Sequence, residues 1–229
     1  MLHREMRLLH VTDFHGNRRW FDWVVDHATD FDAIAYTGDF LDMFGREPLA
    51  EQVRWVTTWA HRLPRSLLWC SGNHDVEPTA SPVLSGRWLR ELPGANAFDR
   101  AGRLHLLGHS FVRMDWQGRV PNLRDGDILL SHAPPAACLT ALSLGGGDHG
   151  SLDLADAFSY AAASPWLVLS GHVHQPRRWK DRCGGIVSLN PGQNAGAKEP
   201  NHIVVDTLAR KARWFSGGEL KGVVVLPES

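Results

Sequence analysis

Five polar clusters in this sequence combine carboxylates, imidazoles and an amide, which are side chains that bind divalent metal ions. The clusters contain Asp13 and His15; Asp39; Asn73 and His74; His132; and His172 and His174. A mixture of imidazole and oxygen ligands suits Mn, Fe or Zn better than Mg or Ca, which prefer oxygen ligands alone. His172 and His174 occupy alternate positions of one loop, so their side chains can point in different directions and serve two ions.

Each cluster taken singly also fits a structural role. Gly38-Asp39 and Gly72-Asn73 are turn signals, and His132 before two prolines fits the end of a strand. Asp13-x-His15 alone is equally consistent with a polar loop. The five clusters together, each at the end of an apolar run and spread over the chain, favour a metal site.

The apolar runs before these clusters predict the strands that must position them. They cover residues 7–11, 32–36, 66–70, 127–130 and 166–169. Helical spacing of apolar residues over 17–28 and 49–62 separates the first three, which predicts a β-α-β-α-β unit with a parallel sheet. Since the carboxyl ends of such strands form the ligand-binding edge of a sheet, the clusters should meet in space.

The second half of the chain has a different pattern. Runs at 103–107 and 111–114 are joined by Gly108, which predicts an antiparallel pair. A helix is expected over 152–163, stopped by Ser164-Pro165, and short strands over 203–205 and 223–225.

Composition is that of one globular domain over residues 1–229, with 43% hydrophobic and 21% charged residues. Lys plus Arg number 24 and Asp plus Glu 25, a net charge of -1. Proteins that bind extended nucleic acid usually have an excess of basic residues, which this chain lacks. Its charge is compatible with a small phosphorylated ligand. No apolar stretch approaches the length of a membrane span, so no membrane partner is expected.

The three cysteines are Cys70, Cys138 and Cys183. An odd count without a Cys-x-x-Cys pair argues against a disulfide framework and against a cysteine zinc site. The N-terminus carries mixed charge and has no signal-peptide features. We therefore expect a cytoplasmic protein with reduced thiols, and the sequence leaves its oligomeric state open.

The ordered motifs resemble those of the calcineurin-like metallophosphoesterases, from residue 7 to residue 174. The matching segments are Asp13-x-His15, Gly38-Asp39-x-x-Asp42, Gly72-Asn73-His74-Asp75, His132 and Gly171-His172-x-His174, with Asn190-Pro191-Gly192 as a trailing turn. The resemblance implies a single metallophosphoesterase domain: a four-layer αββα sandwich of two mixed sheets flanked by helices. It also implies a dinuclear metal site, with Asp13, His15 and His174 on one ion, Asn73, His132 and His172 on the other, and Asp39 between them.

The resemblance further implies that a hydroxide held by two divalent ions attacks phosphorus. His74, which follows the ligand Asn73, is the candidate catalytic acid or donor to the transition state. Asp75 is expected to orient His74, and Asp42 to support a ligand; both also fit ordinary loop carboxylates.

The predicted function is a phosphoesterase acting on small phosphodiester or nucleotide-type substrates. The alternatives are a phosphomonoesterase or protein phosphatase, a non-catalytic scaffold of the same fold, and a nuclease, which the neutral charge disfavours. The complete ligand set favours an enzyme over a scaffold. The Gly-rich segment 145–150, with Asp148 and His149, is a candidate substrate loop or a surface loop. Arg124, Arg177 and Arg178 are candidate phosphate contacts or solvated side chains.

Overall fold

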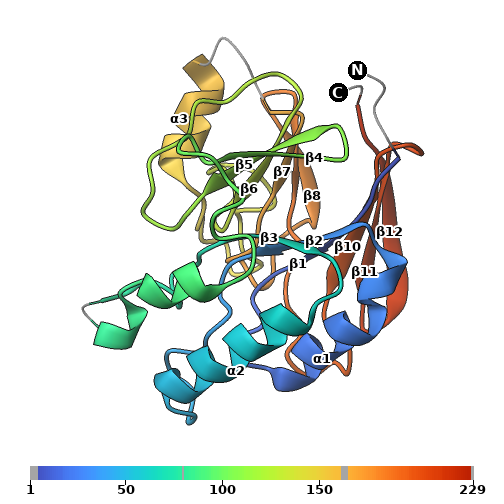
Figure 1. The fold of residues 1–229 in the computed structure, drawn as a ribbon. Coiled ribbons are helices and arrows are strands. Elements are labelled where there is room, and N and C mark those ends of the chain that lie inside the picture. Colours follow the sequence, from blue (N-terminus) through green and yellow to red (C-terminus); the bar gives the residue numbers. More distant parts are fainter. Residues whose placement is uncertain (1–4, 79, 161–164, 228–229) are drawn as a thin grey trace.

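Two six-stranded sheets face each other in the computed structural model, which describes residues 5–78, 80–160 and 165–227 (Figure 1). The first sheet has the order β12-β11-β10-β1-β2-β3. Its strands are β1 (Arg7–Val11), β2 (Ala33–Thr37), β3 (Ser66–Cys70), β10 (His202–Asp206), β11 (Lys211–Ser216) and β12 (Glu219–Val225). The second has the order β4-β5-β6-β7-β9-β8. Its strands are β4 (Arg103–Leu106), β5 (His109–Met114), β6 (Asp127–Ser131), β7 (Leu167–Leu169), β8 (Lys180–Cys183) and β9 (Ile186–Leu189).

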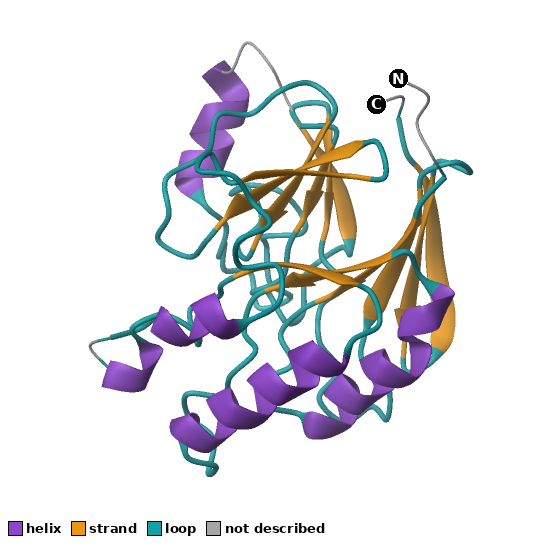
Figure 2. Cartoon of the chain, in the orientation of Figure 1, coloured by secondary structure: helices purple, strands orange, loops and turns teal. Residues whose placement is uncertain are grey.

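Helices cover the outer faces of both sheets (Figure 2). The first sheet carries α1 (Arg18–His27) and α2 (Leu49–Arg62), and the second carries α3 (Leu152–Tyr160). Short 3-10 helices complete the chain: η1 (Ala28–Asp30), η2 (Pro82–Leu84) and η3 (Arg87–Glu91). The predicted four-layer αββα sandwich is therefore confirmed.

Successive side chains of a strand pack into different layers of the core. On β1, Leu8 packs between the two sheets, whereas Leu9 and Val11 pack against the helices, because successive side chains of a strand point to opposite faces. Strands β2 and β6 are buried on both faces, which explains why their sequences are largely apolar and do not alternate with polar residues.

Aromatic side chains fill the layer between the first sheet and its helices. Phe21 of α1 contacts Trp55 and Trp59 of α2 edge-on, at ring-centroid distances of 4.9 and 4.7 Å. These contacts fix both helices on the sheet, and so fix the loops that leave β1 and β2 toward the predicted site.

The five strands that precede the polar clusters come from both sheets. β1, β2 and β3 run parallel in the first sheet, and β6 and β7 run parallel in the second. Strand pairing alone therefore brings the polar clusters together as two groups, one in each sheet. The packing of the two sheets against each other must bring the two groups together.

The structure adds strands that the sequence patterns do not single out, and it corrects one expectation about the cysteines. β8, β9 and β11 lie in the C-terminal part, where β11 joins β10 to β12. The end of the helix predicted over 152–163 lies partly outside the described residues. Cys138 and Cys183 form a disulfide, with Cα atoms 5.9 Å apart, so the expectation of reduced thiols is wrong for this pair. Disulfides are typical of oxidising compartments, so the cysteines no longer support the expected cytoplasmic location, which then rests on the N-terminus alone.

Cys70, the remaining thiol, is free and buried between the sheets. Among the described helices, none combines the length and the apolar character needed to cross a bilayer.

Candidate metal centre

Three side chains from two loops form one half of the centre. Asp13 and His15 follow β1, and His174 follows β7. The Nε2 atoms of His15 and His174 lie 2.9 Å apart, and His174 Nε2 lies 3.5 Å from Asp13 Oδ1. These ligand atoms all lie within 4.8 Å of one another, so one cation can contact them together.

Asp39, His132 and Asn73 form the other half. His132 Nε2 lies 3.3 Å from Asp39 Oδ2 and 3.0 Å from Asn73 Oδ1. The same Asp39 oxygen lies 3.6 Å from His15 Nε2, which belongs to the first half. Asp39 therefore lies within reach of both halves of the centre.

His172 adds an imidazole beside the second half. Its ring centroid lies 5.0 Å from that of His132, and its backbone N–H donates to both carboxylate oxygens of Asp13 at 3.2 and 3.0 Å. The residue therefore orients a ligand of one half through its backbone while its side chain stands next to the other half.

Four of these residues hold a backbone conformation that side-chain-bearing residues seldom adopt. The φ angles are +56° at Asp13, +43° at His15, +59° at Asp39 and +64° at His172. Such strain is stored at functional sites and persists only where the surroundings over-determine it. The strained loops turn the ligands into the centre instead of continuing along their strands.

Buried hydrogen bonds keep the ligands in place. Thr12 Oγ1 donates to Asp13 Oδ2 at 2.7 Å and approaches the Thr37 carbonyl oxygen at 2.9 Å. His132 Nδ1 donates to the Thr37 carbonyl at 2.7 Å, which directs its Nε2 to Asp39. Asn190, in the trailing turn, donates through Nδ2 to the carbonyls of Gly171 and Val173, and so supports the loop that carries both histidines.

The charges of the centre favour a bound cation. Asp13 and Asp39 are buried, and burial alone would raise their pKa values. The surrounding imidazoles outweigh that effect and hold the pKa of each carboxyl below its ordinary value. Burial would lower the pKa of His132, but the charge of Asp39 and the hydrogen bond to it raise it to about 9. The donor set of carboxylates, imidazoles and an amide fits divalent transition-metal ions.

Asp75 is placed differently from the expectation that it orients His74. Its carboxylate accepts hydrogen bonds from four backbone N–H groups, those of Asp39, Phe40, Leu41 and Gly72, at 2.9–3.2 Å. It is completely buried, and burial together with the charge of Asp39 raises its pKa to about 7. Asp75 therefore ties the loops after β2 and β3 to each other and is not placed to act on a substrate.

His74 is half-exposed at the rim of the centre. Its ring centroid lies 4.4 Å from that of His15 and 5.3 Å from that of Phe44. Its Nδ1 accepts a hydrogen bond from the backbone N–H of Met43 at 3.2 Å, so the proton of the neutral ring resides on Nε2. Burial lowers the pKa of this imidazole. Asp42 lies beside His15 and His74, within reach of both rings, and also accepts from the N–H of Phe44.

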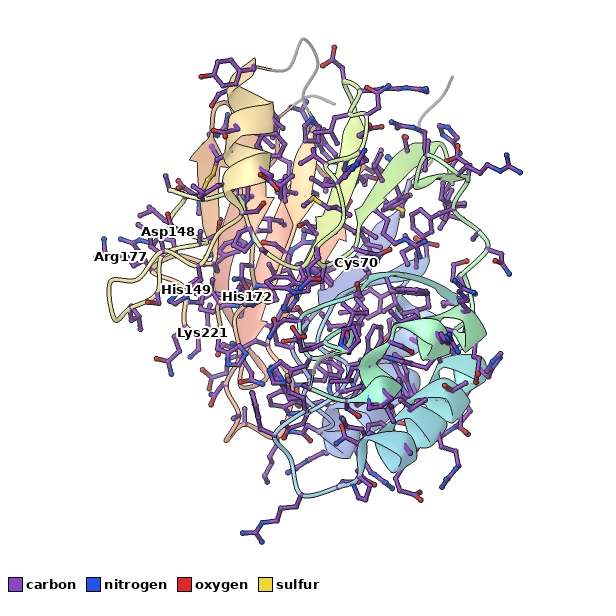
Figure 3. All side chains as sticks on the ribbon, turned by 90° about the vertical axis from the view of Figure 1, so that its left-hand side faces the viewer. Cys70, Asp148, His149, His172, Arg177 and Lys221 are labelled. Atoms are coloured by element: carbon purple, nitrogen blue, oxygen red, sulfur yellow. A yellow bond between two sulfur atoms is a disulfide. The ribbon has the colours of Figure 1, made fainter. Side chains whose placement is uncertain are left out.

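The predicted substrate loop reaches the centre through one residue. The carboxylate of Asp148 accepts from the N–H groups of Ala137 and Gly150 and shapes the loop itself. His149 lies beside His172, at a ring-centroid distance of 6.5 Å (Figure 3). Arg177 and Arg178 are exposed and bond through their backbones, and the backbone N–H of Arg124 donates to Asp127.

Trp116 is a site residue that the sequence analysis missed. It follows β5, and its ring centroid lies 5.1 Å from His172 and 5.6 Å from His132. The segment Asp115-Trp116-Gln117-Gly118 carries no metal-ligand pattern, and β5 precedes none of the five clusters. The sequence offers one sign of it, an indole two positions after the end of a buried strand.

Comparisons with known proteins agree with this geometry. A profile of the calcineurin-like phosphoesterase superfamily domain matches residues 6–210. A probable cyclic nucleotide phosphodiesterase of Rhodococcus erythropolis is 29% identical over 157 residues, which are 62% of this chain and 51% of that protein. The match thus spans about half the length of this curated relative.

Two solved structures share the fold. TT1561 of Thermus thermophilus superposes with a TM-score of 0.60 at 15% identity, covering 93% of this chain and 99% of that chain. Yfce, a phosphoesterase from E. coli, superposes with a TM-score of 0.52 at 16% identity, covering 97% of this chain and 100% of that chain.

The loop before His172 yields a direct prediction about metal binding. A Cβ at Gly171 would overlap both Thr12 Oγ1 and Asp13 Oδ2. We expect Gly171→Ala to displace Asp13 and to lower bound metal at least tenfold at limiting metal concentration. Gly145→Ala is the matched control, since its nearest neighbour would be Ser143 Oγ at 3.7 Å. Elemental analysis with circular dichroism checks this. A folded Gly171→Ala protein that binds metal like the control would contradict it.

Proposed function

The chain belongs to the calcineurin-like phosphoesterase superfamily, and on that basis we propose that it is a dinuclear metal-dependent phosphodiesterase acting on small nucleotide-type substrates. The observation that carries the dinuclear assignment is the position of Asp39. Its Oδ2 lies 3.6 Å from His15 and 3.3 Å from His132, so one carboxylate serves both halves of the centre.

Asp13, His15 and His174 would hold one ion, and Asn73, His132 and His172 the other, with Asp39 shared. When bound, two divalent ions of Mn, Fe or Zn would neutralise the phosphoryl oxygens and activate the attacking water at neutral pH. The contribution of the chain is to hold the ligands in strained loops around two buried carboxylates, Asp13 and Asp39.

His74 completes the chemistry on the side of the leaving group. Because Nδ1 accepts from Met43, Nε2–H is the donor that His74 offers to an oxygen of the substrate. An alkoxide leaves poorly unless it is protonated, so a donor here lowers the barrier most for natural esters. The exposed ring of Phe44 next to His74 provides an apolar wall for the departing group.

Three observations support a small diester rather than an extended polyanion. The net charge of -1 provides no steering field for a long phosphate chain. His149 brings the loop after β6 next to His172, where a compact ligand would meet it. The relative from Rhodococcus erythropolis bears the name of a cyclic nucleotide phosphodiesterase.

A comparison of ester classes tests this proposal. The purified protein, loaded with Mn, would be assayed with bis(4-nitrophenyl) phosphate and 4-nitrophenyl phosphate, and then with natural cyclic nucleotides. We expect a higher kcat/KM for the diester and turnover of at least one cyclic nucleotide. A strong preference for the monoester, with natural diesters left intact, would support the phosphomonoesterase alternative, and no hydrolysis at all would support the scaffold.

Substitution of His74 distinguishes a proton donor from a metal ligand at this position. We expect His74→Ala to keep both metal ions and to lower kcat for a natural diester by about 10²–10⁴-fold. The loss should be smaller for a 4-nitrophenyl ester, whose leaving group needs less protonation. His61→Ala, on the outer helix α2, is the control for removing an imidazole. If His74→Ala empties the centre of metal, His74 is a ligand and this assignment is wrong.

A further inference from the structure

A cavity of about 250 Å³ opens beside the second half of the metal centre. It is lined by Trp116, Gln117, His132, His149 and Asp153, among others. Pockets that hold a whole drug-sized ligand usually measure about 300–1,000 Å³. This cavity therefore has room for one ring system of a substrate rather than for the whole molecule.

The backbone of Trp116 is anchored at this cavity. Its backbone N–H donates to Ser71 Oγ at 3.0 Å, and the N–H of Ser71 donates to Asp115 Oδ1 at 3.0 Å. Ser71 stands two positions before Asn73, so the same short loop anchors the backbone of Trp116 and supplies a predicted ligand. Trp116 is half-buried, packed near His132 and His172 and also lining the cavity.

The other lining residues supply polar groups and a second ring. His149 lines the cavity from the loop after β6, Gln117 from the loop after β5, and Asp153 from the first turn of α3. All three are exposed. An indole face with a carboxylate and an amide nearby is a combination that recognises a planar heterocycle carrying N–H and C=O groups.

The order of groups along this direction matches that of a nucleotide. The metal centre, which includes the imidazoles of His132 and His172, would hold the phosphate, and the indole of Trp116 lies about 5 Å from these two rings. In a nucleotide the ribose separates the phosphate from the base, so a base would lie beside the centre and not in it. His74 and Phe44 lie instead beside His15, in the half to which His132 does not belong. The cavity is therefore positioned for the substituent that stays on phosphorus.

We propose that this cavity binds the nucleobase of the substrate, stacked on Trp116, with Gln117 and Asp153 meeting its polar edge. The proposal rests on the proposed function and names the specificity-determining residue for it. The competing role of Trp116 is to pack the imidazole ligands without contacting substrate.

Two esters with the same leaving group separate these roles. They are thymidine 5′-(4-nitrophenyl phosphate) and ethyl 4-nitrophenyl phosphate, which differ only in the substituent that stays on phosphorus. We expect the Mn-loaded wild-type protein to prefer the thymidine ester, and Trp116→Ala to lower the ratio of the two kcat/KM values by about tenfold. Trp116→Phe should restore part of the ratio. Trp23→Ala, which removes a half-buried indole on α1 outside the cavity, should keep the wild-type ratio.

Binding of products provides a readout that does not need turnover. Calorimetric titration of the Mn-loaded protein with thymidine 5′-monophosphate and with ribose 5-phosphate should show tighter binding of the nucleotide, and Trp116→Ala should reduce that advantage by about tenfold. If neither ester is hydrolysed but the advantage depends on Trp116, the proposed function fails and the base site stands. Equal loss with both esters, or no advantage of the nucleotide in the wild type, would overturn the base site.

Discussion

Two buried carboxylates, those of Asp13 and Asp39, lie among four imidazoles, and the surrounding loops are built to keep them there. Burying like charges together is costly unless each is paired and hydrogen-bonded. The imidazoles of His15, His132 and His174 supply that compensation, and divalent cations fit the same geometry. The fold must therefore bring ligands from two sheets into one small volume, and the loops must remain rigid while they do so.

The details of the loops follow from that requirement. Four backbone N–H groups converge on Asp75 and lock the loops after β2 and β3 against each other. At Gly72 a Cβ would collide with the carboxylate of Asp39, so glycine is required for the two loops to touch. Strain at Asp13, Asp39 and His172 is the conformational cost of this arrangement.

The sequence predicted the parts of this centre that local patterns encode. Arg7–Val11, Leu49–Arg62 and Ser66–Cys70 were predicted with the observed bounds, since apolar periodicity and turn residues mark such elements. The apolar runs alone did not show that β6 and β7 belong to a second sheet, because these strands are buried on both faces like β2. The family resemblance implied two mixed sheets but not which strands each contains. The Cys138–Cys183 disulfide joins residues 45 positions apart, and the role of Asp75 depends on backbone amides that carry no sequence signal. Trp116 escaped notice because its contacts are long-range.

We propose that Asp39 joins two metal ions in one centre. Electron paramagnetic resonance of protein reconstituted with Mn, combined with elemental analysis, tests it most directly, because two Mn ions that share a carboxylate are magnetically coupled. If Asp39 joins the two ions, the protein will bind two Mn ions per chain with a coupled spectrum, and Asp39→Asn will lose the coupling. Saturation at one ion, or two ions with the spectrum of isolated Mn in the wild type, would contradict it.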